Sequence, residues 1–343
     1  MKLFVYYYKN KLGGENLDKA SLSKGAEKFD VDGLELQLLG GFSNNVFECN
    51  RDGESIILKF YPSYLYRKDS IIAELDWIRY LHSSGVYVTR PLLSNDGKYI
   101  ETIKIDNEKE CYVLAFEKAK GSFINVNDAE TWNKDFYYIW GKALGKIHCL
   151  SKNYSPLDKN IKKQEWNMGP LFSDNFNEVS KGVFQRWGKF VNELNKLPKN
   201  KSGYGMIHND LHQGNFYVHN NKIILFDFGD CEYNWFIYDI AIVLYHAVQS
   251  IEENDIKGRE EFAHLFIEAF LEGYLTENNL DSYWLSKLPF FLNYRRIFSY
   301  IYFAQFLNEE QKNNMKVKDK LNGMKEKIES DVPYLEIHCK DFF

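Results

Sequence analysis

The first part of the chain carries short runs in which apolar and polar positions alternate or apolar residues dominate, as in strands. Alternation marks residues 34–38, while residues 55–60 and 111–116 are more uniformly apolar. Together with residues 92–93 they contribute to a predicted antiparallel sheet of five strands. Residues 68–84 instead place apolar side chains at helical spacing, so the pattern predicts one helix beside the sheet.

The rest of the chain is dominated by longer segments with helical spacing. One exception is a pair of short apolar strands that flank Asn220 and Asn221, two residues suited to a tight turn. The pattern therefore predicts an α+β protein. The predicted helices are residues 132–150, 174–195, 235–248, 289–307 and the polar surface helix 309–327.

Polar residues gather on both sides of this hairpin. Asp210 and Asn215 precede the first strand, and Asp227 and Asp230 follow the second. A hydrophobic core does not need carboxylates and an amide at one end of a hairpin. Mg²⁺ prefers oxygen ligands and fills its remaining positions with water and phosphate oxygens. The residue types therefore indicate a divalent cation site and one further carboxylate that serves as a base.

Two motifs in this stretch resemble the aminoglycoside phosphotransferase and choline kinase-like family, small-molecule kinases with the protein-kinase fold. Residues 208–215 read His-Asn-Asp-Leu-His-Gln-Gly-Asn, and residues 227–230 read Asp-Phe-Gly-Asp. The usual family loop is His-Gly-Asp-Leu-His-x-x-Asn, so Asn209 replaces a glycine. The resemblance implies that Asp210 is the catalytic base and that Asn215 and Asp227 are Mg²⁺ ligands. It leaves open whether Asp230 binds metal.

The resemblance also implies a nucleotide site in the strand-rich part. Gly40, Gly41 and Ser43 correspond to the loop that covers the phosphates, although two glycines between strands also fit a plain hairpin. Lys59 corresponds to the lysine that holds the α- and β-phosphates, and Glu74 to the glutamate that orients this lysine. The alternatives are a solvated strand lysine and a helix glutamate that faces solvent.

Further site residues follow from the same resemblance. The backbone of Glu117 and Ala119 is where the family binds the adenine edge. Asp239 is expected to cap a helix and to bond the backbone of the catalytic loop, and His208 to hold that loop from the other side. His148 is interpreted as a residue of a packing helix.

The implied fold has two lobes, with ATP and Mg²⁺ bound between them. Residues 1–116 form the β-rich nucleotide-binding lobe, residues 117–121 a hinge, and residues 122–343 the helical catalytic and substrate-binding lobe. The implied reaction transfers the γ-phosphoryl of ATP (or GTP) to a hydroxyl of a small molecule. The sequence leaves open an aminoglycoside, an amino-acid alcohol, a choline-like amine or a sugar as acceptor.

Two other functions remain as alternatives. A protein kinase is disfavoured, because Asp239 follows Asp227 by only twelve positions and no Ala-Pro-Glu segment lies between them. A nucleotide-binding protein without catalysis is disfavoured because every expected polar residue is present.

The acceptor site is the least readable part of the sequence. Arg295 and Arg296 lie in a strongly aromatic segment, residues 288–297, that begins a predicted helix, and a guanidinium near an apolar face needs a carboxylate, a phosphate or water. One of them could bind an acidic group of the acceptor, or both could reach solvent or an acidic residue of the protein. The aromatic residues Tyr283, Trp284 and Tyr294 could instead hold an amine by cation–π contact.

Composition narrows the setting. The chain has 343 residues and a formal net charge of -5, which gives no reason to expect nucleic acid or a membrane as partner. The apolar segment 235–248 is too short and too polar to span a bilayer. An odd number of scattered cysteines predicts reduced thiols and a cytoplasmic protein. Oligomeric state stays open. The cysteines are Cys49, Cys111, Cys149, Cys231 and Cys339.

Overall fold

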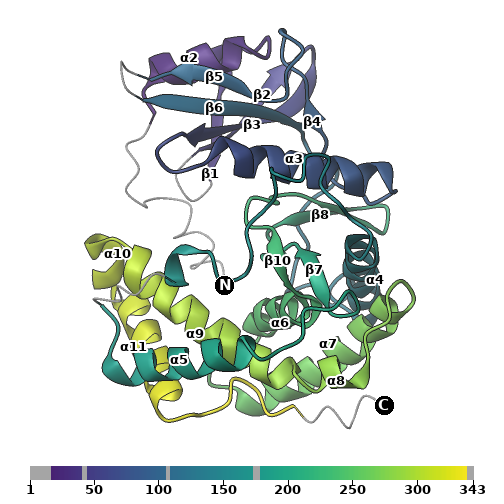
Figure 1. Ribbon diagram of the computed structural model, residues 1–343, viewed down its shortest axis with the longest axis vertical. Coiled ribbons are helices and arrows are strands. Elements are labelled where there is room, and N and C mark those ends of the chain that lie inside the picture. The colour runs from purple at the N-terminus through teal and green to yellow at the C-terminus, as the bar shows by residue number, and fades with distance from the viewer. Residues whose placement is uncertain (1–16, 41–44, 106–108, 173–177, 338–343) are drawn as a thin grey trace. The chain divides into compact units, whose positions relative to one another are not determined.

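The computed structural model describes residues 17–40, 45–105, 109–172 and 178–337. The chain forms two compact units, which are described separately (Figure 1). The first, here called the strand unit, comprises Met1–Lys120, Ser155–Lys163 and Ile224–Gly229. The second, here called the helical unit, comprises Gly121–Tyr154, Gln164–Ile223 and Asp230–Phe343. The predicted lobe ranges lacked the two short segments that return to the strand unit.

The strand unit is built on a six-stranded sheet in which all recorded pairs are antiparallel. Its order is β1-β2-β3-β6-β4, and β5 also pairs with β6. The prediction of five strands was wrong because it missed β5. The strands are β1 (Gln37–Gly40), β2 (Val46–Arg51), β3 (Glu54–Pro62), β4 (Pro91–Leu92), β5 (Glu101–Lys104) and β6 (Glu110–Glu117).

The first strand begins later than the alternation at residues 34–38 predicts. Asp32 accepts a hydrogen bond from the backbone of Leu34 and starts a 3-10 turn, η1 (Gly33–Glu35). The Leu34 side chain is consequently 90% exposed. A local turn thus overrides the strand pattern at this position.

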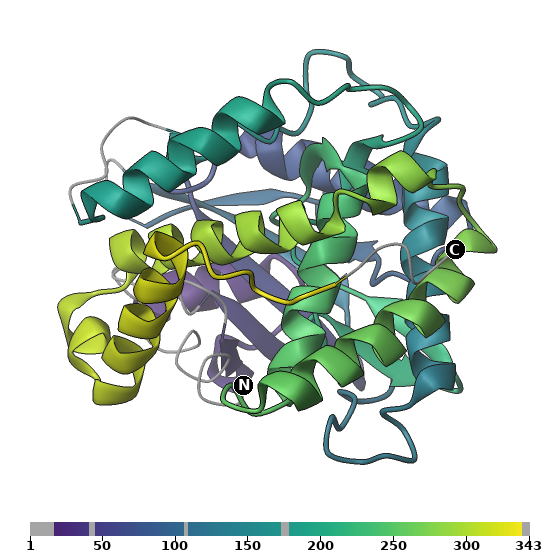
Figure 2. The same cartoon turned by 90° about the horizontal axis from the view of Figure 1, so that it is seen from below.

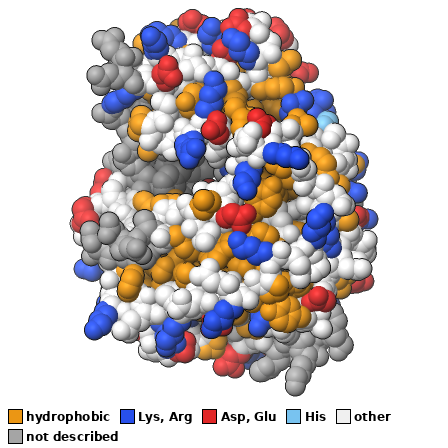
Figure 3. Space-filling view, viewed as in Figure 1, with side chains coloured by type: hydrophobic (Ala, Val, Ile, Leu, Met, Phe, Trp, Pro, Cys, Tyr) orange, Lys and Arg blue, Asp and Glu red, His pale blue; other side chains and the backbone are white. Residues whose placement is uncertain are grey.

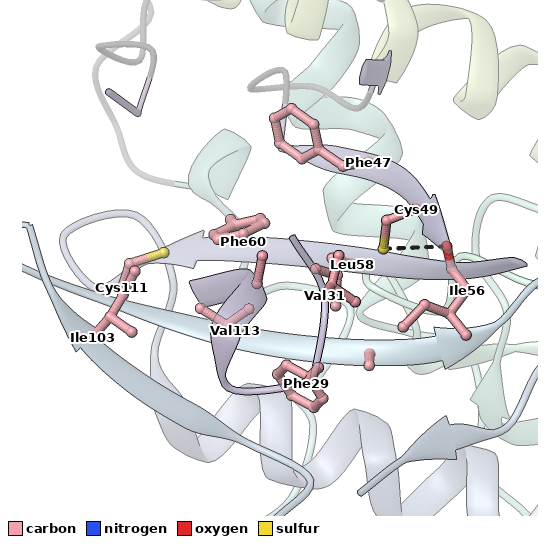
Figure 4. Packing of buried hydrophobic residues seen from close by; sticks show 12 residues of the cluster. Phe29, Val31, Phe47, Cys49, Ile56, Leu58, Phe60, Ile103, Cys111 and Val113 are labelled. Carbon is pink, nitrogen blue, oxygen red and sulfur yellow. Dashed lines mark hydrogen bonds between the residues drawn. The ribbon is translucent and has the colours of Figure 1, made fainter. Parts of the chain in front are cut away.

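One face of the sheet packs against α2 (Lys19–Glu27) and forms the core shown in Figure 4. Leu58 and Phe60 of β3 are fully buried in this core. Because successive side chains of a strand point to opposite faces, Lys59 between them points away from it. The predicted helix of the unit is α3 (Lys68–Ser83), which buries Ile71, Leu75 and Ile78. The core residues are Ala26, Phe29, Val31, Phe47, Cys49, Ile56, Leu58, Phe60, Ile103, Cys111, Val113 and Ala115.

The helical unit contains most of the predicted helices. Their bounds are α4 (Lys134–Ser151), α5 (Lys181–Leu194), α6 (Phe236–Ala247), α7 (Ile256–Leu275), α8 (Ser282–Leu285), α9 (Leu288–Phe306), α10 (Glu309–Asn313) and α11 (Met315–Glu329), with 3-10 turns η2 (Pro170–Phe172) and η3 (Val248–Ser250). The predicted helix 309–327 is therefore two helices. Asn308 caps the first with a capping box, and Asn314 caps the second.

Close helix packing fixes the frame of this unit. A Cβ at Gly141 of α4 would lie 1.8 Å from the carbonyl oxygen of Phe270, so these two backbones touch and only glycine fits. Helix α9 packs against α6, α5 and α11 (Figures 1 and 2). Apolar side chains also show on the outer face of this unit (Figure 3).

Two short strand pairs carry the motif loops. β7 (Tyr204–Ile207) pairs with β10 (Glu232–Trp235), and β8 (Phe216–His219) pairs with β9 (Lys222–Leu225). The predicted hairpin is thus confirmed. Asn220 and Asn221 have φ of 49° and 58°, the left-handed pair that a two-residue turn of this kind requires.

Among the helices of the described residues, none is long and apolar enough to cross a membrane. The four cysteines within the described ranges are all free thiols, and Cys339 lies outside those ranges.

Candidate active site

The loop that carries Asp210 follows β7 in the helical unit, and its backbone is fixed by a buried carboxylate. Asp239 of α6 accepts the backbone N–H of His208 and that of Asn209, both at 2.9 Å. Asn209 has φ of 68°, a left-handed conformation that glycine and asparagine adopt most readily. This explains why asparagine can stand where the family loop usually has glycine. The Asn209 amide also donates to the carbonyl of Asp230 at 3.0 Å.

Asp239 is itself held by His148. The His148 Nε2 lies 3.1 Å from Asp239 Oδ2, and its Nδ1 lies 2.8 Å from the Tyr274 hydroxyl. Burial lowers the pKa of His148, although its contact with Asp239 opposes that shift. The expected cap role of Asp239 was wrong, because α6 begins after Trp235 without a side-chain cap. His148 has the packing position that the sequence predicts.

The Asp210 carboxylate is surrounded by donors. Its Oδ1 accepts from Arg295 Nη2 at 3.3 Å. Its Oδ2 lies 3.4 Å from His212 Nε2 and accepts from Asn215 Nδ2 at 3.1 Å. Burial alone would raise the pKa of Asp210, but His212 and Arg295 outweigh it and hold the pKa well below its usual range. Asp210 is therefore ionised at neutral pH, as a proton acceptor must be.

Asn215 is oriented by the same carboxylate residue. Its Nδ2 donates to the Asp210 backbone carbonyl at 2.8 Å and to Oδ2 at 3.1 Å. Because both recorded bonds use the amide nitrogen, Oδ1 is the atom with which Asn215 can ligate a cation. The side chain is buried, so this orientation is well defined.

Arg295 has protein partners on both sides. Besides Asp210, its Nη2 lies 3.3 Å from His246 Nε2. Burial lowers the pKa of His246 well below its usual value, and the neighbouring His212 and Arg295 add to this shift. A neutral His246 can accept from the guanidinium. Of the two alternatives for Arg295, the structure shows the one in which it pairs with an acidic residue of the protein.

Of the other four acceptor-site candidates, Tyr283 is 44% exposed and three lie in the core of the helical unit. Arg296 is 5% exposed and donates to Val332 O at 2.5 Å and to Asn293 Oδ1 at 3.1 Å. Tyr294 and Trp284 are 2% and 1% exposed. Such burial leaves these rings and this guanidinium without a surface that a substrate could reach, which argues against direct substrate contact.

In the strand unit, Asp227 of the second motif forms an ion pair with Lys59. Lys59 Nζ lies 2.8 Å from Asp227 Oδ1, and the two side chains are 12% and 52% exposed. Burial alone would lower the pKa of Lys59, but Asp227 and Glu74 raise it above its ordinary value. Asp227 has φ of 66°, a strained conformation for a residue with a Cβ. The lysine and the proposed metal ligand thus form one charged pair.

Glu74 lies in the interior of the same unit, only 2% exposed. Burial raises its pKa, and Lys59 and Lys163 oppose that shift. Among the described residues, the recorded ion pair of Lys59 is with Asp227, and Glu74 acts on Lys59 at longer range. The predicted Lys59–Glu74 pairing therefore stays a prediction.

Only some of the remaining predicted nucleotide-site residues lie within the described ranges. Gly40 ends β1 with φ of 132°, whereas Gly41 and Ser43 lie outside the described residues. Glu117 ends β6, donates its backbone N–H to Arg90 O at 2.9 Å and pairs its carboxylate with the Arg90 side chain. Ala119 follows in an irregular segment. The adenine-binding role of Glu117 and Ala119 stays a prediction.

Comparison with known proteins decides the family. Residues 35–283 match the phosphotransferase enzyme family. The chain belongs to this family. It is 32% identical over 320 residues to amicoumacin kinase of Bacillus subtilis (strain 168). The aligned region covers 91% of this chain and 92% of that protein. The predicted family and the predicted small-molecule kinase activity are therefore confirmed.

Solved structures confirm the fold of this phosphotransferase. The structure of amicoumacin kinase hAmiN in complex with AMP-PNP, Ca²⁺ and Ami is 29% identical, with a TM-score of 0.86 and full coverage of both chains. A microcompartment-associated aminopropanol kinase has a TM-score of 0.71 at 18% identity, covering 92% of this chain and 98% of its own. The predicted α+β, protein-kinase-like fold class is confirmed.

The sequence did not predict the contacts that three residues of the phosphotransferase make at or near the motif loops. These residues are His212, His246 and Lys163. His212 stands inside the recognised motif, so its position was visible but its contact with Asp210 was not. His246 interrupts the apolar segment 235–248, but nothing in the sequence shows that it lies beside Arg295. Lys163 lies in a lysine-rich stretch, where no local pattern distinguishes it from its neighbours.

Proposed function

We propose that this phosphotransferase transfers the γ-phosphoryl group of ATP to a hydroxyl of a small molecule, with Asp210 as the base. The observation that carries the proposal is the Asp210 carboxylate, held by Arg295, His212 and Asn215. A carboxylate fixed in its ionised form can accept a hydrogen bond from the acceptor's hydroxyl and then its proton. Phosphoryl transfer otherwise needs little beyond positioning and charge neutralisation.

The two motifs offer oxygen atoms of the kind that a divalent cation binds. Asn215 presents Oδ1, and the half-exposed Asp227 carboxylate is accessible to a ligand. These are the hard oxygen donors that Mg²⁺ prefers. When bound, Mg²⁺ would take its other ligands from phosphate and water oxygens and neutralise phosphate charge. Asn215 and Asp227 are therefore the proposed metal ligands, while Asp230 is left without a role.

Nucleotide binding is assigned to the strand unit. Lys59 carries a positive charge beside Asp227 and is suited to hold phosphate oxygens. The turn after Gly40 would supply backbone N–H groups to the phosphates, and the backbone of Glu117 and Ala119 would bind the adenine edge. ATP is proposed over GTP because the hAmiN structure at 29% identity contains AMP-PNP. We place the enzyme in the cytoplasm, where ATP and Mg²⁺ are available.

The acceptor is proposed from the relatives and from Arg295. Amicoumacin is the first acceptor to test, since an amicoumacin kinase shares 32% identity over most of both chains. Because Arg295 pairs with Asp210, it is not left to bind an acidic group of the acceptor. This favours an acceptor without a carboxylate over a homoserine-like one.

The test is an acceptor panel under identical MgATP. Amicoumacin, a kanamycin-type aminoglycoside, homoserine and choline are each incubated with the enzyme, and ADP release and the product mass are measured. Phosphorylation of amicoumacin, lost in Asp210→Asn, supports the proposal. ADP that stays at the level measured without enzyme, with every acceptor and in the wild type as in Asp210→Asn, would instead favour a nucleotide-binding protein without catalysis.

A further inference from the structure

A buried lysine in the short segment Ser155–Lys163 has no place in the reaction described so far. Lys163 is only 5% exposed, and a lysine is rarely buried unless its charge is paired or hydrogen-bonded. Its segment belongs to the strand unit and is attached to α3 at two points. The backbone of Leu157 donates to Asp76 Oδ2 at 3.1 Å, and Lys163 Nζ lies 3.4 Å from Ser70 Oγ.

The shortest recorded contact of Lys163 is with the loop that carries Asp227. Its Nζ donates to the carbonyl oxygen of Gly229 at 2.7 Å. Gly229 follows Asp227 by two positions, and Phe228 between them is 1% exposed. Lys163 therefore ties the end of this loop to the start of α3.

A buried carboxylate lies close to the same cation. Glu74 follows Ser70 by one turn of α3, so the two residues share a face of the helix. The charges of Lys59 and Lys163 both favour the ionised form of Glu74. Lys59 bonds to the side chain of Asp227, and Lys163 bonds to the backbone of Gly229. The two lysines thus hold one loop at two places.

We propose that Lys163 is a positioning residue for Asp227: it fixes the backbone of residues 227–229 so that the Asp227 carboxylate keeps its place for the metal. The inference rests on the proposed function, because that function makes Asp227 a metal ligand. A non-glycine residue at φ of 66° keeps that conformation only where its surroundings enforce it. The bond from Lys163 to Gly229 O is such a restraint.

The test compares variants of two neighbouring lysines. Lys163→Met removes the charge and the donor at similar length, Lys163→Arg keeps both, and Lys162→Met is the matched control because Lys162 is exposed. Calorimetry measures the affinity for a non-hydrolysable ATP analogue with Mg²⁺ and with EDTA. Steady-state kinetics gives KM for the acceptor, and thermal unfolding reports whether each variant is folded.

We expect Lys163→Met to reduce the gain in nucleotide affinity that Mg²⁺ provides by about 10- to 100-fold, the usual loss when a partner of a metal ligand is removed. Affinity in EDTA and KM for the acceptor should stay near wild type. Lys163→Arg should recover most of the gain, and Lys162→Met should match wild type. If Lys163→Met does not fold, Lys163→Gln, which keeps a donor but no charge, takes its place.

An unchanged Mg²⁺ gain in the folded variant overturns the inference. So does a loss that falls equally on the Mg²⁺ gain, the affinity in EDTA and the acceptor KM, because that pattern means general loosening. Asp227→Ala separates this from a failure of the proposed function. If Asp227→Ala loses the Mg²⁺ gain and Lys163→Met keeps it, only Lys163 is misassigned; if Asp227→Ala keeps it, Asp227 is no metal ligand and both proposals fall.

Discussion

The loop of Asp210 and the loop of Asp227 each hold a left-handed backbone conformation, but different side chains stabilise them. Each contains a non-glycine residue in the left-handed region, Asn209 at φ of 68° and Asp227 at φ of 66°. The first loop is fastened by the fully buried Asp239, which accepts two of its backbone N–H groups. The second is fastened by two lysines, one at the Asp227 side chain and one at the Gly229 carbonyl.

The Asp210 and Asp227 carboxylates also differ in how far they are exposed and in how they are held. Asp210 is 28% exposed and has three side-chain partners, whereas Asp227 is 52% exposed and has Lys59 as its recorded ion-pair partner. A base gains from being held in one ionised geometry before the substrate arrives. A metal ligand must instead stay open to an incoming ion. Of the two carboxylates, the proposed base is thus the more enclosed and the proposed metal ligand Asp227 the more accessible, whereas the other proposed ligand, Asn215, is buried.

The largest effect is expected at the base. Asp210→Asn keeps the shape but removes the proton acceptor, so kcat should fall by about 10²–10⁴-fold, the usual contribution of a general base. Affinity for MgATP, measured by calorimetry, should stay nearly unchanged because base and metal ligands are separate residues. A variant with wild-type kcat on its true acceptor would show that the base is assigned wrongly.

A change at Asp227 should affect MgATP binding, whereas the change at Asp210 affects kcat. Asp227→Ala is expected to weaken MgATP binding by about a hundredfold, since losing one partner of a charge contact costs about 2–5 kcal/mol. Asn215→Ala should weaken it less, because its ligand oxygen is neutral. Calorimetric titration with MgATP measures both. Unchanged affinity in the two variants would remove the metal site from the proposal.

Arg295 and Arg296 of α9 provide a matched pair of variants, because only Arg295 is recorded as a partner of Asp210. Arg295→Ala removes a charged donor from Asp210, and such a bond is worth about 1.5–3 kcal/mol, so kcat should fall roughly 10- to 100-fold. KM for ATP should not change. Arg296→Ala is the matched control, because Arg296 bonds to Val332 O and Asn293. It should lower the unfolding temperature and leave kcat in folded protein intact; equal kcat losses would argue against the Asp210 role.

The smallest effect concerns stability and pH. Burial lowers the pKa of His148 below its ordinary value of 6.5, so the unfolded chain binds more protons as the pH falls through that value. The stability that neutral His148 provides is complete above pH 6.5 and declines below it by up to about 1.4 kcal/mol per pH unit. His246 acts in the same direction. Thermal unfolding from pH 7 to 5 should decline less steeply in His148→Gln, and an identical slope would contradict this cause.

Local chemistry made part of this structure predictable. The turn at Asn220 and Asn221 and the motif loops were found because their residue types and spacing carry the signal themselves. β5 was missed because its four residues become a strand only by pairing with β6. The role of Arg295 stayed open between the acceptor and an acidic residue of the protein, since a sequence cannot show that its partner lies 85 positions away. Distant pairing, not local preference, decided both cases.

The contacts of Asp239 also set how long the base loop stays intact. The amide hydrogens of His208 and Asn209 bond to a carboxylate that is fully buried and anchored through His148 to Tyr274 of α7. These amides can exchange with solvent deuterium only when their bonds to Asp239 break. Because that acceptor is held in the interior of the helical unit, their exchange should be slower than that of loop amides exposed to solvent.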